Sequence, residues 1–245
     1  MKRRNFDVNL VLGILIVAVV ASCKKNNDSS PTFTVPDTYT FDNVEYAEAS
    51  GSMAMWAGFT SYLEKAAGRQ LSADPATYLW NNTNNAYTAE TSANLPFTVT
   101  AINAFDFNLS GNSADQIIFK QFIDSMVNVS KSFNTPTSPG SPGKIGTRLV
   151  NYSGLEFNQL MAKGLMGALQ LDQVNNYLNK SMTDDNNTVT PGKGTAMQHD
   201  WDLAFGYVGI PTDYDSARTY ANTEANRPLA LGGYFLLALG PSLLF

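Results

Sequence analysis

The chain has 245 residues, which is enough for one domain or two small ones. Apolar residues make up 44% of it and charged residues 15%, so the composition excludes wholesale disorder as well as collagen-like or coiled-coil structure. The net charge of -5 argues against binding to the phosphate backbone of nucleic acid, and the single cysteine excludes an internal disulfide.

The first 22 residues are typical of an export signal. Basic residues at positions 2–4 precede an apolar run over residues 8–20, which is too short to span a bilayer comfortably. The run ends in the sequence VASC at residues 20–23, which resembles the lipobox of bacterial lipoproteins. That resemblance implies cleavage before Cys23 and lipid attachment to it, and several acyl chains give a stable anchor. The alternative is an ordinary signal peptide followed by a chance cysteine.

Residues 23–36 are predicted to be a flexible tether, because they are mainly polar and lack an apolar period. Lys24 follows the cysteine, where enteric lipoproteins retained at the inner membrane carry an aspartate. We therefore expect the outer membrane, on either its periplasmic or its surface face.

Residues 37–227 are predicted to form one all-α domain. Apolar residues at spacings of three and four predict helices, and Ser-x-x-Gln and Ser-x-x-Glu patterns predict capping boxes at residues 113–116 and 153–156. Gly164 and Gly167 predict close approach by a neighbouring helix. The expected helices cover residues 52–67, 74–80, 113–129, 153–178 and 195–207.

The segments between these helices are expected to be irregular. Residues 81–110 are rich in Asn and Thr and predict a loop with a short strand over residues 97–99. Residues 135–146 carry prolines and glycines without an apolar run, which predicts a surface connection. A further polar loop is expected over residues 179–194.

The last segment, residues 228–245, is apolar and carries no charge. One glycine pair, Gly232-Gly233, and the step Gly240-Pro241 interrupt it, which disfavours a membrane span. We interpret it as the product of a truncated or frameshifted reading, so the helical bundle is expected to be incomplete at its C-terminus and the apolar tail not native to it.

The strongest candidate for a functional site in the sequence is the pair His199 and Asp202. An imidazole and a carboxylate three positions apart in a helix project from adjacent turns and can share one divalent ion, such as zinc or iron. On a helical wheel they lie beside Gly206, away from a packing stripe of Met197, Trp201, Ala204, Phe205 and Val208. Two ligands are too few for a metal site, and Glu156 in the preceding helix is the candidate third.

Each of these residues also has a structural interpretation. Asp202 could accept a hydrogen bond from His199 or from a neighbouring backbone group, and Glu156 could close a capping box at its helix start. Under this alternative the same residues form a polar network, and the protein is a non-enzymatic binding or scaffolding module for a protein or glycan partner.

A family resemblance is carried by residues 38–44, 154–168 and 194–207. These segments resemble an uncharacterised lipoprotein family of Bacteroidota whose domain of unknown function is similar to imelysin. The resemblance implies a bundle of helices with a G-x-H-x-x-E motif, linked to metal binding and to a contested peptidase activity. His199 matches the histidine of that motif, and Asp202 takes the place of its glutamate. Peptidase activity is implied by this resemblance alone.

Overall fold

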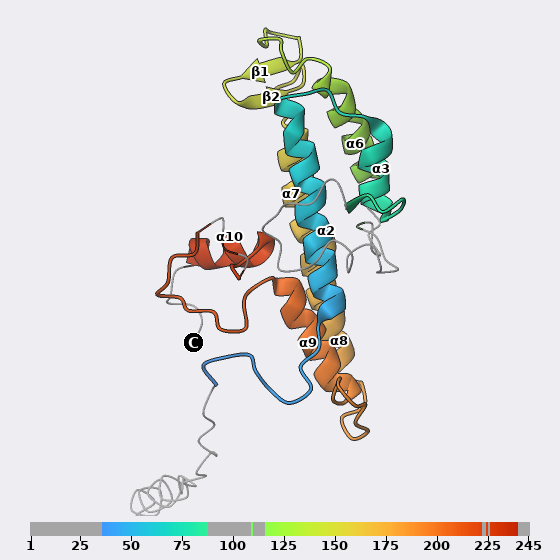
Figure 1. Ribbon diagram of the computed structural model, residues 1–245, viewed down its shortest axis with the longest axis vertical. Coiled ribbons are helices and arrows are strands. Elements are labelled where there is room, and N and C mark those ends of the chain that lie inside the picture. Colours follow the sequence, from blue (N-terminus) through green and yellow to red (C-terminus); the bar gives the residue numbers. More distant parts are fainter. Residues whose placement is uncertain (1–35, 88–108, 110–115, 222–223, 225, 240–245) are drawn as a thin grey trace, which may run out of the picture. The chain divides into compact units, whose positions relative to one another are not determined.

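The structure is a computed structural model that describes residues 36–87, 109, 116–221, 224 and 226–239. The chain divides into two units, Met1–Asp37 and Thr38–Phe245, and the fold below belongs to the second. The predicted signal peptide, Cys23, most of the tether, the strand at 97–99 and the start of the helix at 113 lie outside the described residues. Within those residues the fold is mainly helical, which confirms the coarse prediction, and its one β-sheet has two short strands (Figure 1).

Helix α2, Ala47–Glu64, continues into the 3-10 turn Lys65–Ala67 and packs against α3, α7 and α9. The prediction placed its start at residue 52, five residues too late. Its first turns carry small residues that are buried on several sides, among them Ala49, Gly51 and Ala54. A helix enclosed by neighbours has no single apolar stripe, so the periodicity search missed its N-terminal part.

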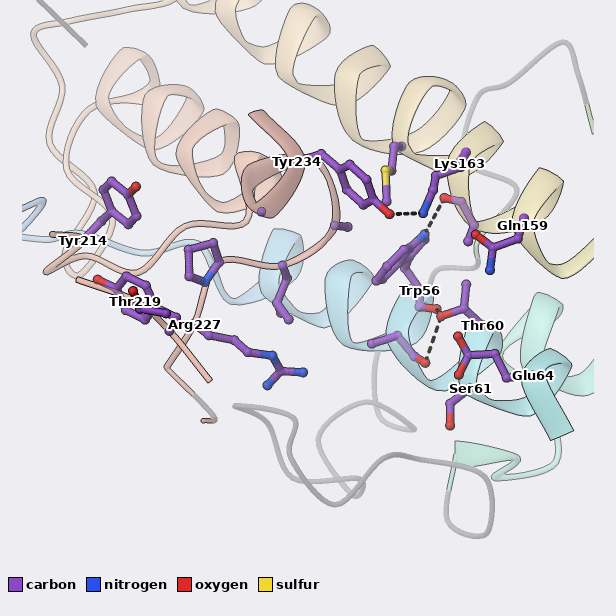
Figure 2. Close-up of a pocket in the computed structure, with 18 of the residues that line it drawn as sticks. Trp56, Thr60, Ser61, Glu64, Gln159, Lys163, Tyr214, Thr219, Arg227 and Tyr234 are labelled. Atoms are coloured by element: carbon purple, nitrogen blue, oxygen red, sulfur yellow. Dashed lines mark hydrogen bonds between the residues drawn. The ribbon is translucent and has the colours of Figure 1, made fainter. Parts of the chain in front are cut away.

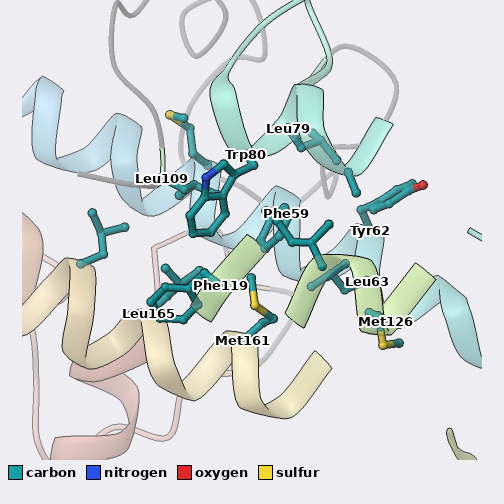
Figure 3. Packing of buried hydrophobic residues seen from close by; sticks show 14 of the residues in the cluster. Phe59, Tyr62, Leu63, Leu79, Trp80, Leu109, Phe119, Met126, Met161 and Leu165 are labelled. Carbon is teal, nitrogen blue, oxygen red and sulfur yellow. The ribbon is translucent and has the colours of Figure 1, made fainter. Parts of the chain in front are cut away.

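Helices α3, Ala73–Asn81, and α6, Gln116–Ser130, cover the C-terminal half of α2. Trp80 lies at the centre of this core, with its ring centroid 5.6 Å from that of Phe59 and 5.7 Å from that of Phe119 (Figure 3). The hydroxyl of Tyr87 donates to the carbonyl oxygen of Leu79 at 2.7 Å, so a buried phenol is satisfied by the backbone.

A β-hairpin occupies part of the segment predicted to be an irregular surface connection. Strand β1, Gly143–Ile145, pairs antiparallel with β2, Arg148–Val150. The first of the two residues between the strands, Gly146, has a φ of 59°, which glycine adopts without strain. Strands of three residues are too short to show an alternating pattern, which is why the sequence did not reveal them.

The long helix predicted over residues 153–178 is three consecutive helical segments. Helix α7 is Phe157–Leu165, a π-helical stretch follows over Met166–Leu171, and α8 is Asp172–Ser181. The capping box predicted at 153–156 was wrong, because Glu156 is itself the N-cap and no described side chain caps the helix. Ser153 instead donates its N–H to the Asn151 side chain.

The two glycines predicted to mark close helix packing, Gly164 and Gly167, have different surroundings in the structure. A Cβ atom at Gly164 would lie 2.9 Å from the ring of Phe119, so the prediction is confirmed there with α6 as the neighbour. At Gly167 no described atom would lie within 4 Å, so the prediction is wrong at that position.

Helix α9, Ala196–Val208, packs along α8 and against α2 (Figure 1). Thr195 is its N-cap and shares a full capping box with Gln198, whose side chain accepts from the Thr195 N–H at 2.9 Å. The helix predicted from Thr195 to Tyr207 is therefore confirmed.

The beginning of the C-terminal apolar segment packs on this helical domain. The N–H of Leu229 donates to the Gly209 carbonyl at 2.7 Å, and helix α10, Ala230–Leu239, follows. The fully buried side chain of Gln170 bridges the Tyr207 carbonyl and the Leu231 N–H, both at 3.0 Å. Across the part of the chain that the structure describes, no helix has both the length and the apolar character needed to cross a membrane.

Candidate functional site

Asp202 holds the start of the domain onto α9. Its Oδ1 accepts a hydrogen bond from the Tyr39 hydroxyl at 2.9 Å, and its Oδ2 accepts from the backbone N–H of Glu45 at 3.0 Å. The Tyr39 ring also stacks on Phe205, with centroids 3.8 Å apart. Burial and the Asp202 carboxylate raise the pKa of Tyr39, so its hydroxyl stays protonated as a donor. Both carboxylate oxygens of Asp202 are therefore used in joining residues 39–45 to the helix.

His199 lies beside the same segment. Its Nδ1 is 3.7 Å from Oε2 of Glu45, and Lys193 Nζ is 3.8 Å from the same oxygen. The Nδ1 atom is buried and has no hydrogen-bond partner among the described residues. The structure therefore brings His199 and Asp202 to one segment, but no hydrogen bond joins them directly.

Glu156, the third predicted ligand, is at the N-terminus of α7. Its Oε2 accepts from Arg148 in β2 at 2.6 Å. This contact anchors the hairpin to the helix start and places the carboxylate in an ion pair.

The three predicted donors do not fit a divalent ion. Nowhere in the described part of the chain do three His, Cys, Asp or Glu side chains form a group that could hold a metal. Asp202 is committed to two hydrogen-bond donors and Glu156 to a cation, and structural metal sites need three or four ligands. The zinc or iron site therefore stays a prediction, without support from the arrangement of its donors.

A buried carboxylate next to these residues was missed by the sequence analysis. Asp200 is 2% exposed, and its Oδ1 accepts from Lys180 Nζ at 3.1 Å, which joins α9 to α8. Burial raises the pKa of Asp200, while its hydrogen bond raises the pKa of Lys180. No motif marks this pair, because its members are twenty positions apart in different helices.

A cleft of about 810 Å³ lies between α2, α7 and two further segments, residues 214–220 and 227–234 (Figure 2). Trp56 lines the cleft, and its indole N–H donates a hydrogen bond to the carbonyl of Ala162 at 3.2 Å. Thr60 donates its hydroxyl to the Trp56 carbonyl at 2.9 Å. The Trp56 bond thus joins the α2 wall to the α7 wall, while the Thr60 bond lies within α2. The volume is within the usual range for small-molecule sites.

Aromatic rings and cations also line the cleft. Tyr214 and Tyr220 are stacked with centroids 5.7 Å apart, and the Arg218 guanidinium lies 4.5 Å from the centre of the Tyr220 ring. Lys163 donates to the Tyr234 hydroxyl and lies 4.2 Å from the centre of that ring. In each of these contacts a positively charged group lies against the face of an aromatic ring, which attracts the cation electrostatically.

The balance of charge in the cleft differs from that of the chain. Among the described residues that line it, Lys163, Arg218 and Arg227 are cations and Glu64 is the single carboxylate. Arg218 is paired with Glu224 near the rim, whereas Lys163 forms no ion pair within the described part of the chain. A chain with a net charge of -5 therefore presents a cleft with an excess of positive side chains.

The fold and the cleft define the class of this protein as a mainly α-helical domain with a surface site of ligand size. A family model described as Domain of unknown function (DUF4856) matches residues 36–225, and the chain belongs to that family. No curated protein and no solved structure matches the chain. The family description names no activity, so the lipoprotein character and the similarity to imelysin stay predictions.

Proposed function

We propose that the protein is a non-enzymatic binding module of the cell envelope, anchored at Cys23 and held off the outer membrane by residues 23–36. Its ligand binds in the cleft between α2, α7 and residues 214–220 and 227–234. The observation that carries this proposal is the cleft itself, which combines ligand-sized volume, aromatic walls and a few converging polar groups.

The lining of the cleft favours recognition over hydrolysis. General acid and base catalysis by carboxylates needs two such groups, and the described lining residues offer Glu64 alone. The single histidine of the chain, His199, lies beside Glu45 and does not line the cleft. The peptidase activity implied by the imelysin resemblance therefore has no assembled donor set in this cleft.

The binding proposal is tested by the indole N–H resonances of the three tryptophans. We expect members of a small-molecule fragment library to shift the Trp56 resonance, because this side chain lines the cleft. Trp80 in the core and Trp201, 49% exposed on α9, serve as internal controls that should not move. A library that leaves Trp56 unchanged, or that moves all three resonances together, would contradict a binding site in the cleft.

The anchoring proposal predicts a change of location for Cys23→Ser. The wild-type chain should fractionate with the outer membrane, whereas the variant should lose that association because it lacks the thiol that carries the lipid. Ser29→Ala, in the tether, is the matched control and should stay membrane-bound. Membrane association that survives Cys23→Ser would refute the lipid anchor.

A further inference from the structure

The cleft also indicates the class of its ligand. Resting on the proposed binding function, we infer that it takes a small acidic carbohydrate, meaning a sugar that carries carboxylate or sulfate groups.

Positive charge in the cleft supports the acidic part of this inference. Lys163 lies at the cleft, and its ammonium contacts a phenol instead of a carboxylate. The exposed ammonium of Lys163 can form a charge-assisted hydrogen bond with a carboxylate or sulfate oxygen that replaces water beside it. Arg227, labelled in Figure 2, lines the same cleft, and Arg218 lines it as well while paired with Glu224. Both side chains add positive charge to the surroundings of an anionic ligand.

The aromatic walls support the carbohydrate part. Tyr234 is 52% exposed, and Trp56 adds a second ring to the lining. The negative face of an aromatic ring attracts the weakly positive C–H face of a sugar ring. Gln159, Thr60 and Ser61 supply amide and hydroxyl groups that can exchange hydrogen bonds with sugar hydroxyls.

A peptide is disfavoured by the shape of the walls. Extended peptides bind to sheet edges, and helical peptides bind to apolar grooves. In the described part of the chain the only sheet is the hairpin of β1 and β2, which does not line the cleft. The cleft walls carry charged and hydroxyl-bearing side chains rather than a continuous apolar floor.

The test applies the full chain, extracted in detergent, to an array of uronate- and sulfate-bearing oligosaccharides, their neutral counterparts and acidic peptides. We expect acidic sugars to bind at least about tenfold more tightly than the matched neutral sugars, with affinity falling as salt is added. Lys163→Met should lower the affinity for acidic sugars about tenfold, because it removes the charge but keeps most of the stem.

The matched control is Lys120→Met, which removes the same charge from the exposed surface of α6 outside the cleft and should leave binding unchanged. Equal binding of neutral and acidic sugars, binding of acidic peptides alone, absence of any glycan binding, or equal effects of the two lysine variants would each overturn the inference. If fragments shift the Trp56 resonance while no acidic sugar binds, the binding function stands and the ligand class is wrong.

Discussion

Replacing Asp202 by alanine should lower the free energy of unfolding by about 3 kcal/mol, measured by urea unfolding followed by circular dichroism. Asp202 is 6% exposed and accepts hydrogen bonds from the Tyr39 hydroxyl and the Glu45 N–H. The alanine leaves both partly buried donors without their acceptor, and the cost of an unsatisfied donor exceeds the net value of the bond. The segment over residues 39–45 should then loosen from α9.

Three comparisons isolate this effect. Asp124→Ala removes an exposed carboxylate from α6 and should change stability by less than about 0.5 kcal/mol. Tyr39→Phe removes one of the two bonds but keeps the stack on Phe205, so we expect a loss of about 1 kcal/mol. A chelator should leave the wild-type melting temperature unchanged. A lower melting temperature on chelation would instead assign Asp202 to a metal site.

The variant Gly206→Ala should cost about 2 kcal/mol of stability, although alanine favours helices over glycine. A Cβ atom at Gly206 would lie 2.7 Å from the Cβ of Ala49 and 3.0 Å from side-chain atoms of Tyr46. Real Cβ atoms do not approach so closely, so α9 and α2 would have to move apart. Thermal melting measures the loss as a lower melting temperature.

The matched control is Gly167→Ala, since no described atom lies within 4 Å of the added methyl group. It should leave the protein unchanged or stabilise it by up to about 1 kcal/mol through helix propensity. Adding Ala49→Gly to Gly206→Ala should recover part of the loss, because it removes the nearest clashing atom. Equal effects of the two single glycine variants would disprove the tight contact between α9 and α2.

Local signals predicted some helix ends well and others poorly. The helix start predicted at Thr195 is confirmed, and the structure adds a complete capping box with Gln198, three residues away, that the sequence analysis did not name. The Ser-x-x-Glu pattern at residues 153–156 predicted a capping box that does not form. The Ser153 N–H bonds to the Asn151 side chain in a turn before the helix, and Glu156 is the N-cap. A capping pattern shows which hydrogen bonds the side chains can form. Whether they form depends on competition from hydrogen bonds within neighbouring turns.

The cleft could not be predicted from the sequence. Trp56, Lys163 and Arg218 come from three segments separated by long stretches of chain, and no local period or motif connects them. The available signal was the concentration of tyrosine and arginine over residues 214–220, which becomes informative only when α2 and α7 are placed opposite it.

The sequence by itself determined that the domain is mainly helical and that residues 196–208 form a helix, because spacing and caps act within a few turns of chain. It also separated a face with His199, Asp202 and Gly206 from a stripe with Trp201 and Phe205. Which face is covered was decided by tertiary structure. The expectation was wrong for Trp201, which is half exposed, whereas the face of Asp202 and Gly206, for which a pocket and burial were both open, packs against residues 39–49. Glycine and a satisfied carboxylate permit closer approach of a neighbouring chain than an indole does, and whether such a neighbour arrives depends on residues far away in the sequence.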